Sequence, residues 1–311
     1  MVPTLPAPPL VQKAGAAARF AFDEFFAGRI RNKHTRAAYL HAVQKFLGWC
    51  EERGLDLIAV TPGLIGHYLD EHPGSPPTKK LHMSAIRGFF DLLVVRHVVV
   101  LNPALSAKTE RYSALDGKTP EITVEQARRL LQSIPRRLPV DYRDRAIIAL
   151  LIYTAARAGA VAALRLGDLV DEGTQRSLRF REKGGKQRAI PVRHDLEQLL
   201  LEYLSSSTTA AKRKESPLFR TSQGRSGTLG DRPLTGADIC RMVKRRIRVA
   251  GLPSGISPHS FRACTATDLL LQGVPLEDVQ HLLGHADARV TRLYDRRQKR
   301  VTRNIVERIS V

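Results

Sequence analysis

Apolar residues recur every three or four positions over long stretches of this chain, which is the spacing of one buried face of an α-helix. Between residues 17 and 105 the pattern predicts four helices packed as a small bundle, one stopped by Gly54 and the next capped by Thr61. The fourth helix is expected to bury Leu81, Ala85, Phe89, Leu92 and Leu93. Residues 1–16 contain four prolines and show little periodicity, which predicts a flexible tail.

A second helical pattern begins after a stretch that has no periodicity. Residues 106–120, SAKTERYSALDGKTP, are predicted to be a linker between two domains. Thr123 and Gln126 have the spacing of a capping box, in which each side chain accepts a hydrogen bond from the other residue's backbone N–H. They are expected to open the second domain, which covers residues 121–311.

Within the second domain, alternating apolar residues on both sides of a Gly-Gly turn predict a β-hairpin with Lys183 at its tip. Further along, Pro258 predicts the first turn of a helix that stops at Gly273. A second helix should end at Gly284, and a third, short helix should present Tyr294. The predicted fold class is mainly α, with a small antiparallel β-sheet in the second of two domains.

The charge balance indicates which class of partner the protein binds. Among 311 residues, 50 Lys and Arg exceed 30 Asp and Glu, which gives a net charge of +20 and a pI near 10.5. This excess predicts a polyanionic partner, with nucleic acid favoured over an anionic membrane because no run of about 18 apolar residues occurs. We expect a soluble cytoplasmic protein, associated with the nucleoid, whose three separated cysteines are reduced; these are Cys50, Cys240 and Cys264.

Basic residues gather in two places where DNA contact is predicted. In the first domain they lie near the starts of two helices, where free N–H groups favour phosphates; this set is Arg31, Lys33, Thr35, Arg36, Lys79, Lys80 and Arg87. In the second domain, residues 212–248 hold eleven Lys or Arg and three acidic residues. A helix capped by Thr235 is expected to turn its basic face to a DNA groove or its phosphates; this face comprises Arg241, Lys244, Arg245 and Arg248.

The stretch after residue 257 concentrates chemically unusual residues. His259 and Arg262 lie three apart and therefore share one helix face. His285 follows a predicted helix end in the segment LLGH, and Tyr294 comes nine residues later. Each of these residues taken singly is more simply explained as a surface or packing residue, and only the combination indicates a reactive site.

The combination resembles the second catalytic box of the tyrosine recombinases, the phage integrase family that includes the Xer and Cre enzymes. The segment YTAARAGAVAALRLGDL resembles the first box of that family, with Arg157 in the arginine position. The segment REKGGKQRAIPV resembles its hairpin, with Lys183 in the position of the catalytic lysine. The resemblance covers residues 122–294, and more loosely the first domain.

The resemblance implies a two-domain protein, with a SAM-like helical core-binding domain and a catalytic domain that form a C-shaped clamp on double-stranded DNA. The residues that would carry the reaction are Arg157, Lys183, His259, Arg262, His285 and Tyr294. The arginines would bind the non-bridging phosphate oxygens with help from the histidines, and Tyr294 would attack phosphorus. Lys183 would protonate the departing 5′-oxygen, and no metal or nucleotide cofactor is implied.

The chain departs from the family pattern in three places. Ala160 stands where many members carry an acidic residue, and Ala155 and Ala156 stand where glycine is usual. These departures imply that Arg157 or one of the histidines is supported by other residues than in most members. Two alternatives to a site-specific recombinase stay open. One is a type IB topoisomerase, which has a similar active site, and the other is a basic DNA-binding protein that has lost catalysis.

The same stretch also contains residues that can bind metal ions. His281 and His285 are four apart, and His259 and Cys264 are near them in the sequence. The segment HLLGH lacks the glutamate that a zinc-protease helix places after its first histidine, so no metal is predicted.

The residues after the tyrosine carry an apolar stripe. Val301, Ile305 and Ile309 recur every four residues within Asp295–Val311. The stripe would either pack on its own domain or, as the resemblance implies, dock on a neighbouring protomer of a homotetramer assembled on paired DNA sites.

Overall fold

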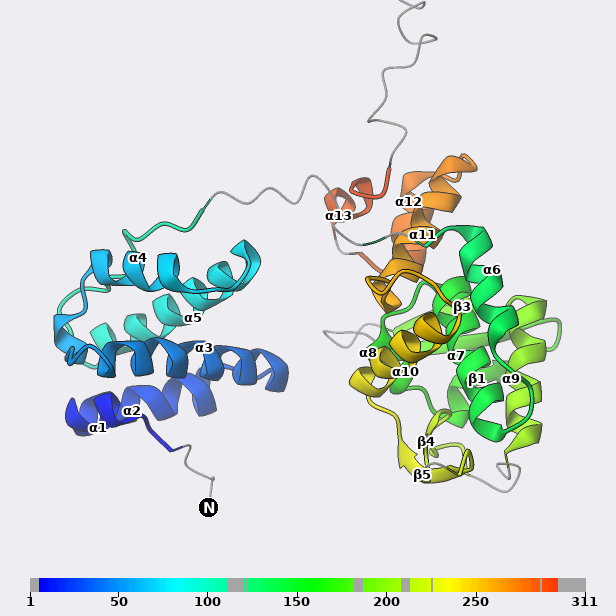
Figure 1. Ribbon diagram of the computed structural model, residues 1–311, viewed down its shortest axis with the longest axis horizontal. Helices are drawn as coiled ribbons and strands as arrows, with labels where there is room; N and C mark the ends of the chain where they lie inside the picture. Colours follow the sequence, from blue (N-terminus) through cyan, green and yellow to red (C-terminus); the bar gives the residue numbers. More distant parts are fainter. Residues whose placement is uncertain are drawn as a thin grey trace, which may run out of the picture. The chain divides into compact units, whose positions relative to one another are not determined.

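The computed structural model describes residues 6–110, 120, 122–181, 187–207, 213–224, 226–285 and 287–295. The chain divides into two compact units, Met1–Ser113 and Ala114–Val311 (Figure 1). The boundary falls inside the predicted linker, most of which lies outside the described residues.

In the described residues of the first unit, 6–110, all regular secondary structure is helical. Its α-helices are α1 (Pro9–Lys13), α2 (Ala16–Asp23), α3 (Lys33–Glu51), α4 (Pro62–Glu71) and α5 (Pro76–Val95). Helix α2 continues into a π-helical turn, Glu24–Arg29, and a short 3₁₀ turn, Leu57–Ala59, precedes α4. The Asn32 side chain accepts hydrogen bonds from two backbone N–H groups at the start of α3, and Thr61 caps α4 as predicted.

Aromatic rings dominate the core of this unit. Phe22, Phe26 and Phe89 are fully buried and meet edge to face. The expectation of a flexible tail over residues 1–16 is wrong for the described part, because α1 packs Leu10 and Val11 into the same core. Proline at the first turn starts this helix, although the proline content of residues 1–16 predicted a flexible segment.

One predicted core position of the fourth helix is also wrong. Leu81 in α5 is 38% exposed, whereas Ala85, Phe89, Leu92 and Leu93 are buried as expected.

The second unit is larger and also mainly helical. Its helices are α6 (Val124–Ser133), α7 (Pro139–Thr154), α8 (Ala158–Ala162), α9 (His194–Ser206), α10 (Gly236–Val249), α11 (Pro258–Leu271), α12 (Leu276–Leu283) and α13 (Ala288–Arg292). Helix α7 forms the centre: residues 146–151 are completely buried, and α7 contacts α6, α8, α9, α10 and α11. The predicted capping box of Thr123 and Gln126 opens α6.

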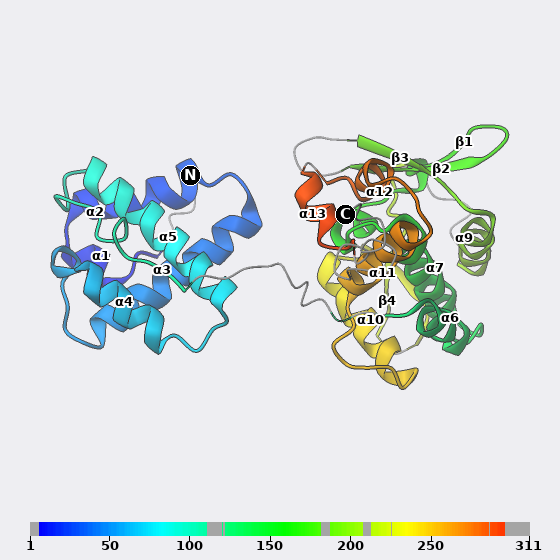
Figure 2. The same cartoon turned by 90° about the horizontal axis from the view of Figure 1, so that it is seen from above.

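Two small antiparallel sheets complete this unit (Figure 2). The first contains β1 (Leu169–Asp171), β2 (Arg176–Arg181) and β3 (Gln187–Pro191), in that order. Strands β2 and β3 are the predicted hairpin, and the pairing of Leu178 with Ile190 places both side chains in the core. The hairpin tip with Lys183 lies outside the described residues.

The second sheet, β4 (Arg220–Ser222) with β5 (Leu229–Pro233), was not predicted, because its short polar strands lack an alternating apolar pattern. The overall class, mainly helical with small antiparallel sheets, is as predicted. None of the helices among the described residues is long and apolar enough to cross a membrane.

Candidate active site

The end of α7 delivers Arg157 to the site. Ala155 follows the helix in the left-handed conformation, with φ of 49°, and the chain then turns so that Arg157 becomes the N-cap of α8. An L-residue with a side chain adopts this conformation at a cost of roughly 1–2 kcal/mol, which glycine avoids. The alanine noted at a usual glycine position therefore keeps the glycine-like backbone, and Arg157 remains exposed.

Arg262 on α11 is the buried centre of the site. Its side chain is only 2% exposed, and Nη1 donates to the carbonyl oxygen of Ala155 at 2.6 Å while Nη2 donates to that of Leu283. These acceptors lie at the C-terminal ends of α7 and α12, where carbonyl groups lack intrahelical partners and the helix dipole is negative. The guanidinium group is thus held in one place by two helix ends.

His285 follows directly after the glycine that ends α12. Gly284 adopts a left-handed conformation, with φ of 62°, as its predicted role as a helix stop requires. The imidazole Nδ1 lies 2.9 Å from Oγ1 of Thr291, a support that the sequence did not reveal. Burial, followed by the nearby charges of Arg262 and Arg157, lowers the pKa of His285 to about 4, so the ring is neutral near pH 7.

Tyr294 lies in the turn after α13 and faces both histidines. Its hydroxyl is 3.4 Å from Nε2 of His259, and its ring stacks near that of His285 with centroids 6.2 Å apart. Burial raises the pKa of the Tyr294 phenol, although the positive charges of Arg262 and Arg157 act in the opposite direction. Burial outweighs the effect of these charges, so the free protein holds a neutral phenol.

Arg157 and three segments between residues 259 and 294 therefore converge on one site. Arg157 lowers the pKa values of both His259 and His285, and it acts on Tyr294 as well, so its guanidinium lies close to all three. For His259, burial is the largest cause of the lowered pKa. Five of the six predicted reactive residues are brought together, and the sixth, Lys183, is outside the described residues.

A groove of about 390 Å³ adjoins His285 and contains a residue that the sequence reasoning missed. Arg188 on β3 lines it together with Gln280 and His281, and its charge contributes to the lowered pKa of His285. Its signal in the sequence was only its place on the return strand of the predicted hairpin. Among the described residues, no three His, Cys, Asp or Glu side chains form a group that could hold a metal ion.

The predicted basic residues of the first unit differ in what they contact. The guanidinium of Arg36 donates two hydrogen bonds to the carbonyl of Ile30, and Arg87 donates to that of Ala104. Lys79 pairs with Glu110 at 3.5 Å. These three side chains bind other groups of their own unit, which the sequence could not show. At the start of α3, Arg31 and Lys33 are exposed, and Thr35 is half-buried. Lys80 is half-buried in α5.

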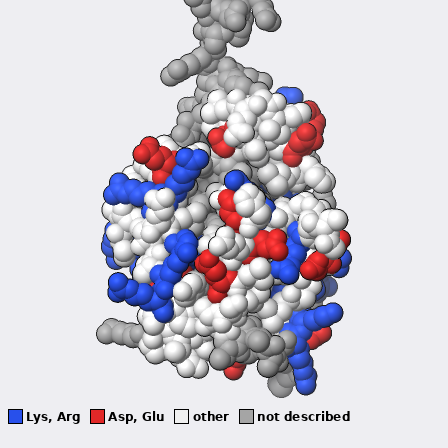
Figure 3. Space-filling model, turned by 90° about the vertical axis from the view of Figure 1, so that its right-hand side faces the viewer, with Lys and Arg blue, Asp and Glu red and all other residues white. Residues whose placement is uncertain are grey.

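The predicted basic face of α10 is more open. Arg241, Lys244, Arg245 and Arg248 line one side of a groove of about 520 Å³. Thr221 and Ser222 of β4 lie across it and add two hydroxyl groups. On the face drawn in Figure 3, by contrast, basic and acidic side chains lie next to one another in small groups. The groove beside α10 is therefore the strongest candidate for a DNA-binding surface in this unit.

Comparison with known proteins gives a consistent picture. Residues 120–300 match the phage integrase family, and residues 22–97 match the N-terminal SAM-like domain of phage integrases. Tyrosine recombinase XerD of Chlorobaculum tepidum is 30% identical over 270 residues, which cover 84% of this chain and 85% of that protein. Tyrosine recombinase XerC of Mycobacterium sp. (strain KMS) is 30% identical over 293 residues, covering 88% and 92%.

Two solved structures share the fold. XerH site-specific recombinase bound to difH substrate has a TM-score of 0.68 at 21% identity, covering 99% of this chain and 89% of that one. A lambda integrase dimer bound to a COC′ core site has a TM-score of 0.69 at 18% identity, covering 94% and 78%. Together with the family match over more than half its length, these similarities show that the chain belongs to the phage integrase family of tyrosine recombinases.

Proposed function

We propose that this protein is a site-specific DNA recombinase that cuts and rejoins strands through a 3′-phosphotyrosine intermediate on Tyr294. The observation that carries the proposal is the position of the Tyr294 hydroxyl, 3.4 Å from His259 and within the electrostatic reach of Arg157 and Arg262. A phosphate bound between these groups would lie next to an oxygen nucleophile and two guanidinium groups.

In the cleavage step, the Tyr294 oxygen would form a bond to phosphorus while the bond from phosphorus to the 5′-oxygen breaks. The phenol must lose its proton as it attacks, because its raised pKa keeps it protonated in the free protein, and the neutral Nε2 of His259, 3.4 Å from the hydroxyl, would accept that proton. Lys183 would give a proton to the 5′-oxygen, which leaves as a hydroxyl. A 5′-hydroxyl from another strand would then attack phosphorus and displace the Tyr294 oxygen, which takes back a proton. One phosphodiester bond is thus exchanged for another, and no ATP is consumed.

The arginines would stabilise the charge that develops on the non-bridging oxygens. Arg262 would do so from a fixed position, because two backbone carbonyls hold it, and Arg157 would approach from the more open side. The neutral rings of His259 and His285 would each offer one N–H donor, and Thr291 would orient the second of them.

The partner would be double-stranded DNA, bound by both units. We expect residues 17–105 to act as the core-binding domain, joined by residues 106–120 to the catalytic domain so that the two close round a duplex. The segment after Tyr294 would link protomers into a homotetramer on paired sites; among the similar structures is a lambda integrase tetramer bound to a Holliday junction. The work of such an enzyme would place it with the nucleoid in the cytoplasm.

The test is trapping of the covalent complex on nicked duplex DNA, with Tyr294→Phe compared with the parent. We expect Tyr294→Phe to bind DNA as tightly as the parent and to form no adduct on a denaturing gel, because one oxygen is removed and little packing is lost. Tyr153→Phe is the matched control, since it also removes one tyrosine hydroxyl, which among the described residues donates to Asp195 and not to a predicted reactive residue. An adduct that survives in Tyr294→Phe would mean that another residue is the nucleophile.

A further inference from the structure

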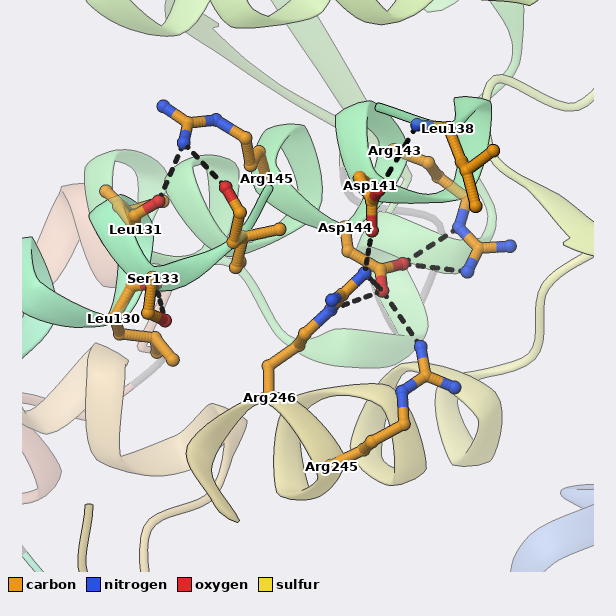
Figure 4. A network of polar contacts seen from close by, with 11 residues as sticks. Leu130, Leu131, Ser133, Leu138, Asp141, Arg143, Asp144, Arg145, Arg245 and Arg246 are labelled. Atoms are coloured by element: carbon orange, nitrogen blue, oxygen red, sulfur yellow. Dashed lines mark hydrogen bonds and ion pairs between the residues drawn. The ribbon is translucent and has the colours of Figure 1, made fainter. Parts of the chain in front are cut away.

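Helix α10 is tied to the start of α7 by a buried charge network (Figure 4). Asp144 is completely buried, and one of its oxygens accepts two hydrogen bonds from Arg143, at 2.7 and 3.1 Å. The other oxygen accepts one from Arg245 and one from Arg246, each at 2.9 Å. Arg246 also reaches Asp141 at 2.7 Å. A buried carboxylate is costly unless fully paired, so these contacts fix the directions of three guanidinium groups.

Arg245 differs from the other arginines of this network. The side chains of Arg143 and Arg246 are 4% and 11% exposed, whereas that of Arg245 is 56% exposed. Only its Nη2 contacts Asp144, and the rest of the group faces the groove beside α10. Arg245 is therefore held by a rigid buried carboxylate and is still open to a ligand.

Arg241, one helical turn earlier, has the same arrangement. Its Nη2 pairs with Oδ1 of Asp238, and its side chain is 71% exposed. Asp238 is itself held by Thr235, whose backbone N–H and hydroxyl donate to Oδ2 at 2.8 and 2.6 Å. Two exposed arginines, four residues apart on one face of α10, are thus each oriented by a carboxylate that other groups fix in place.

The neighbouring cations of the groove are different. Within the parts of the chain that the structure describes, neither Lys244 nor Arg248 has an ion pair or hydrogen bond to another side chain. Such side chains reorient freely, which suits phosphate contacts, where charge counts more than direction. Recognition of a base instead requires a planar fork in a defined orientation.

We propose that Arg241 and Arg245 recognise guanines in the DNA target, and that Lys244 and Arg248 bind phosphates. Arginine donates two hydrogen bonds to O6 and N7 of guanine in the major groove, and a carboxylate-held guanidinium loses less freedom when it does so. Four helical residues rise about 6 Å, roughly two base-pair steps when the helix follows the groove. The two guanines should therefore lie about two base pairs apart. This inference rests on the proposed function, because it needs a DNA target.

The test is selection of bound duplexes from a random DNA pool by the full chain carrying Tyr294→Phe, which keeps cleavage out of the measurement. Arg245→Lys and Arg248→Lys form a matched pair, because they make the same charge-conserving change on the same helix. We expect Arg245→Lys to lose a guanine preference of roughly 5- to 150-fold at one position, while Arg248→Lys selects the same sequences as the parent. Arg241→Lys should lose the preference at a second position.

Thermal melting followed by circular dichroism checks that each variant is folded. Arg241→Lys keeps the test decisive if Arg245→Lys fails to fold, because its ion pair lies on the surface. The inference is overturned if the folded lysine variants of Arg241 and Arg245 select the same sequences as the parent, or if Arg248→Lys is the one that loses a guanine. Trapping of adducts by the Tyr294-containing chain then still supports the proposed function. A parent that neither binds nor cleaves any DNA would overturn both.

Discussion

Replacing Arg262 by lysine should damage both the fold and the reaction. The guanidinium donates to two carbonyl oxygens from different helices, and the side chain is 2% exposed. An ammonium group keeps the charge and has three N–H donors, but they all lie on one nitrogen. That nitrogen cannot occupy the positions of both Nη1 and Nη2, so it reaches only one of the two acceptors. A buried acceptor left without a partner costs about 1–3 kcal/mol, and the lost hydrogen bond to a charged donor contributes about 1.5–3 kcal/mol.

These two terms overlap, so we expect Arg262→Lys to lower the free energy of unfolding by about 2–4 kcal/mol. For a unit of this size, each kcal/mol lowers the melting temperature by roughly 2–4 °C. Single-turnover cleavage of nicked DNA, measured below the transition, should slow by a further factor of about 10²–10³, because the phosphate loses one fixed donor.

Arg157→Lys is the matched control for the structural part. Arg157 is exposed, so its replacement should slow cleavage without a comparable loss of stability. Urea denaturation and single-turnover rates of both variants would be measured side by side. If Arg262→Lys unfolds at the same urea concentration as the parent, the two carbonyl contacts do not anchor the site, and the argument fails.

Three further predictions concern the leaving group, the tail and pH. Lys183→Ala should cleave ordinary DNA poorly but should regain cleavage when sulfur replaces the bridging 5′-oxygen, because a thiolate leaves without a proton. Arg157→Ala should not regain cleavage on this substrate. Equal recovery of both variants would exclude Lys183 as the acid. In gel shifts, a chain ending at Lys299 should bind one DNA site but lose cooperative binding to two sites and strand exchange. If the shortened chain still pairs two sites, the residues after Lys299 only pack on their own domain. If the full-length monomer relaxes supercoiled DNA, the topoisomerase alternative is favoured. Because the pKa of His285 is lowered to about 4, the unfolded chain takes up a proton more readily, so stability should fall as pH drops from about 6.5 to about 4. In His285→Gln, the free energy of unfolding from urea titrations should depend less on pH between about 6.5 and 4. If its dependence on pH equals that of the parent, the burial of the His285 ring is contradicted.

Local signals in the sequence predicted the elements around the site well. The capping residues Thr61, Thr123 and Thr235 all cap helices, and Gly284 ends α12 in the left-handed conformation. Each of these signals acts within a few residues, so the sequence contains both partners of the interaction. Where a local signal misled, as with the prolines before α1, burial against distant helices decided the outcome.

The electrostatics of the site could not be predicted in the same way. The positive charge around Tyr294 was visible in the sequence, but the burial that raises its pKa depends on packing that no spacing reveals. The partners of Asp144 are equally hidden: two of its donors come from α10, 101 and 102 residues away in the chain. Asp144 lies in a charged stretch, residues 141–145, just before the apolar run of α7, and nothing in that stretch indicated that it would orient arginines in a groove.

The position of Arg262 shows why the site has to be built from separated segments. A guanidinium group buried among apolar side chains would be unstable without compensation. The ends of α7 and α12 supply that compensation, because each offers a carbonyl that its own helix cannot use, and these carbonyls are 107 and 21 residues away from Arg262 in the chain. The left-handed residues Ala155 and Gly284 end those helices at the site, and the chain then continues directly to Arg157 and His285. The same turns thus stabilise one buried cation and deliver the next reactive side chains beside it, so a change at either turn should disturb stability and catalysis together.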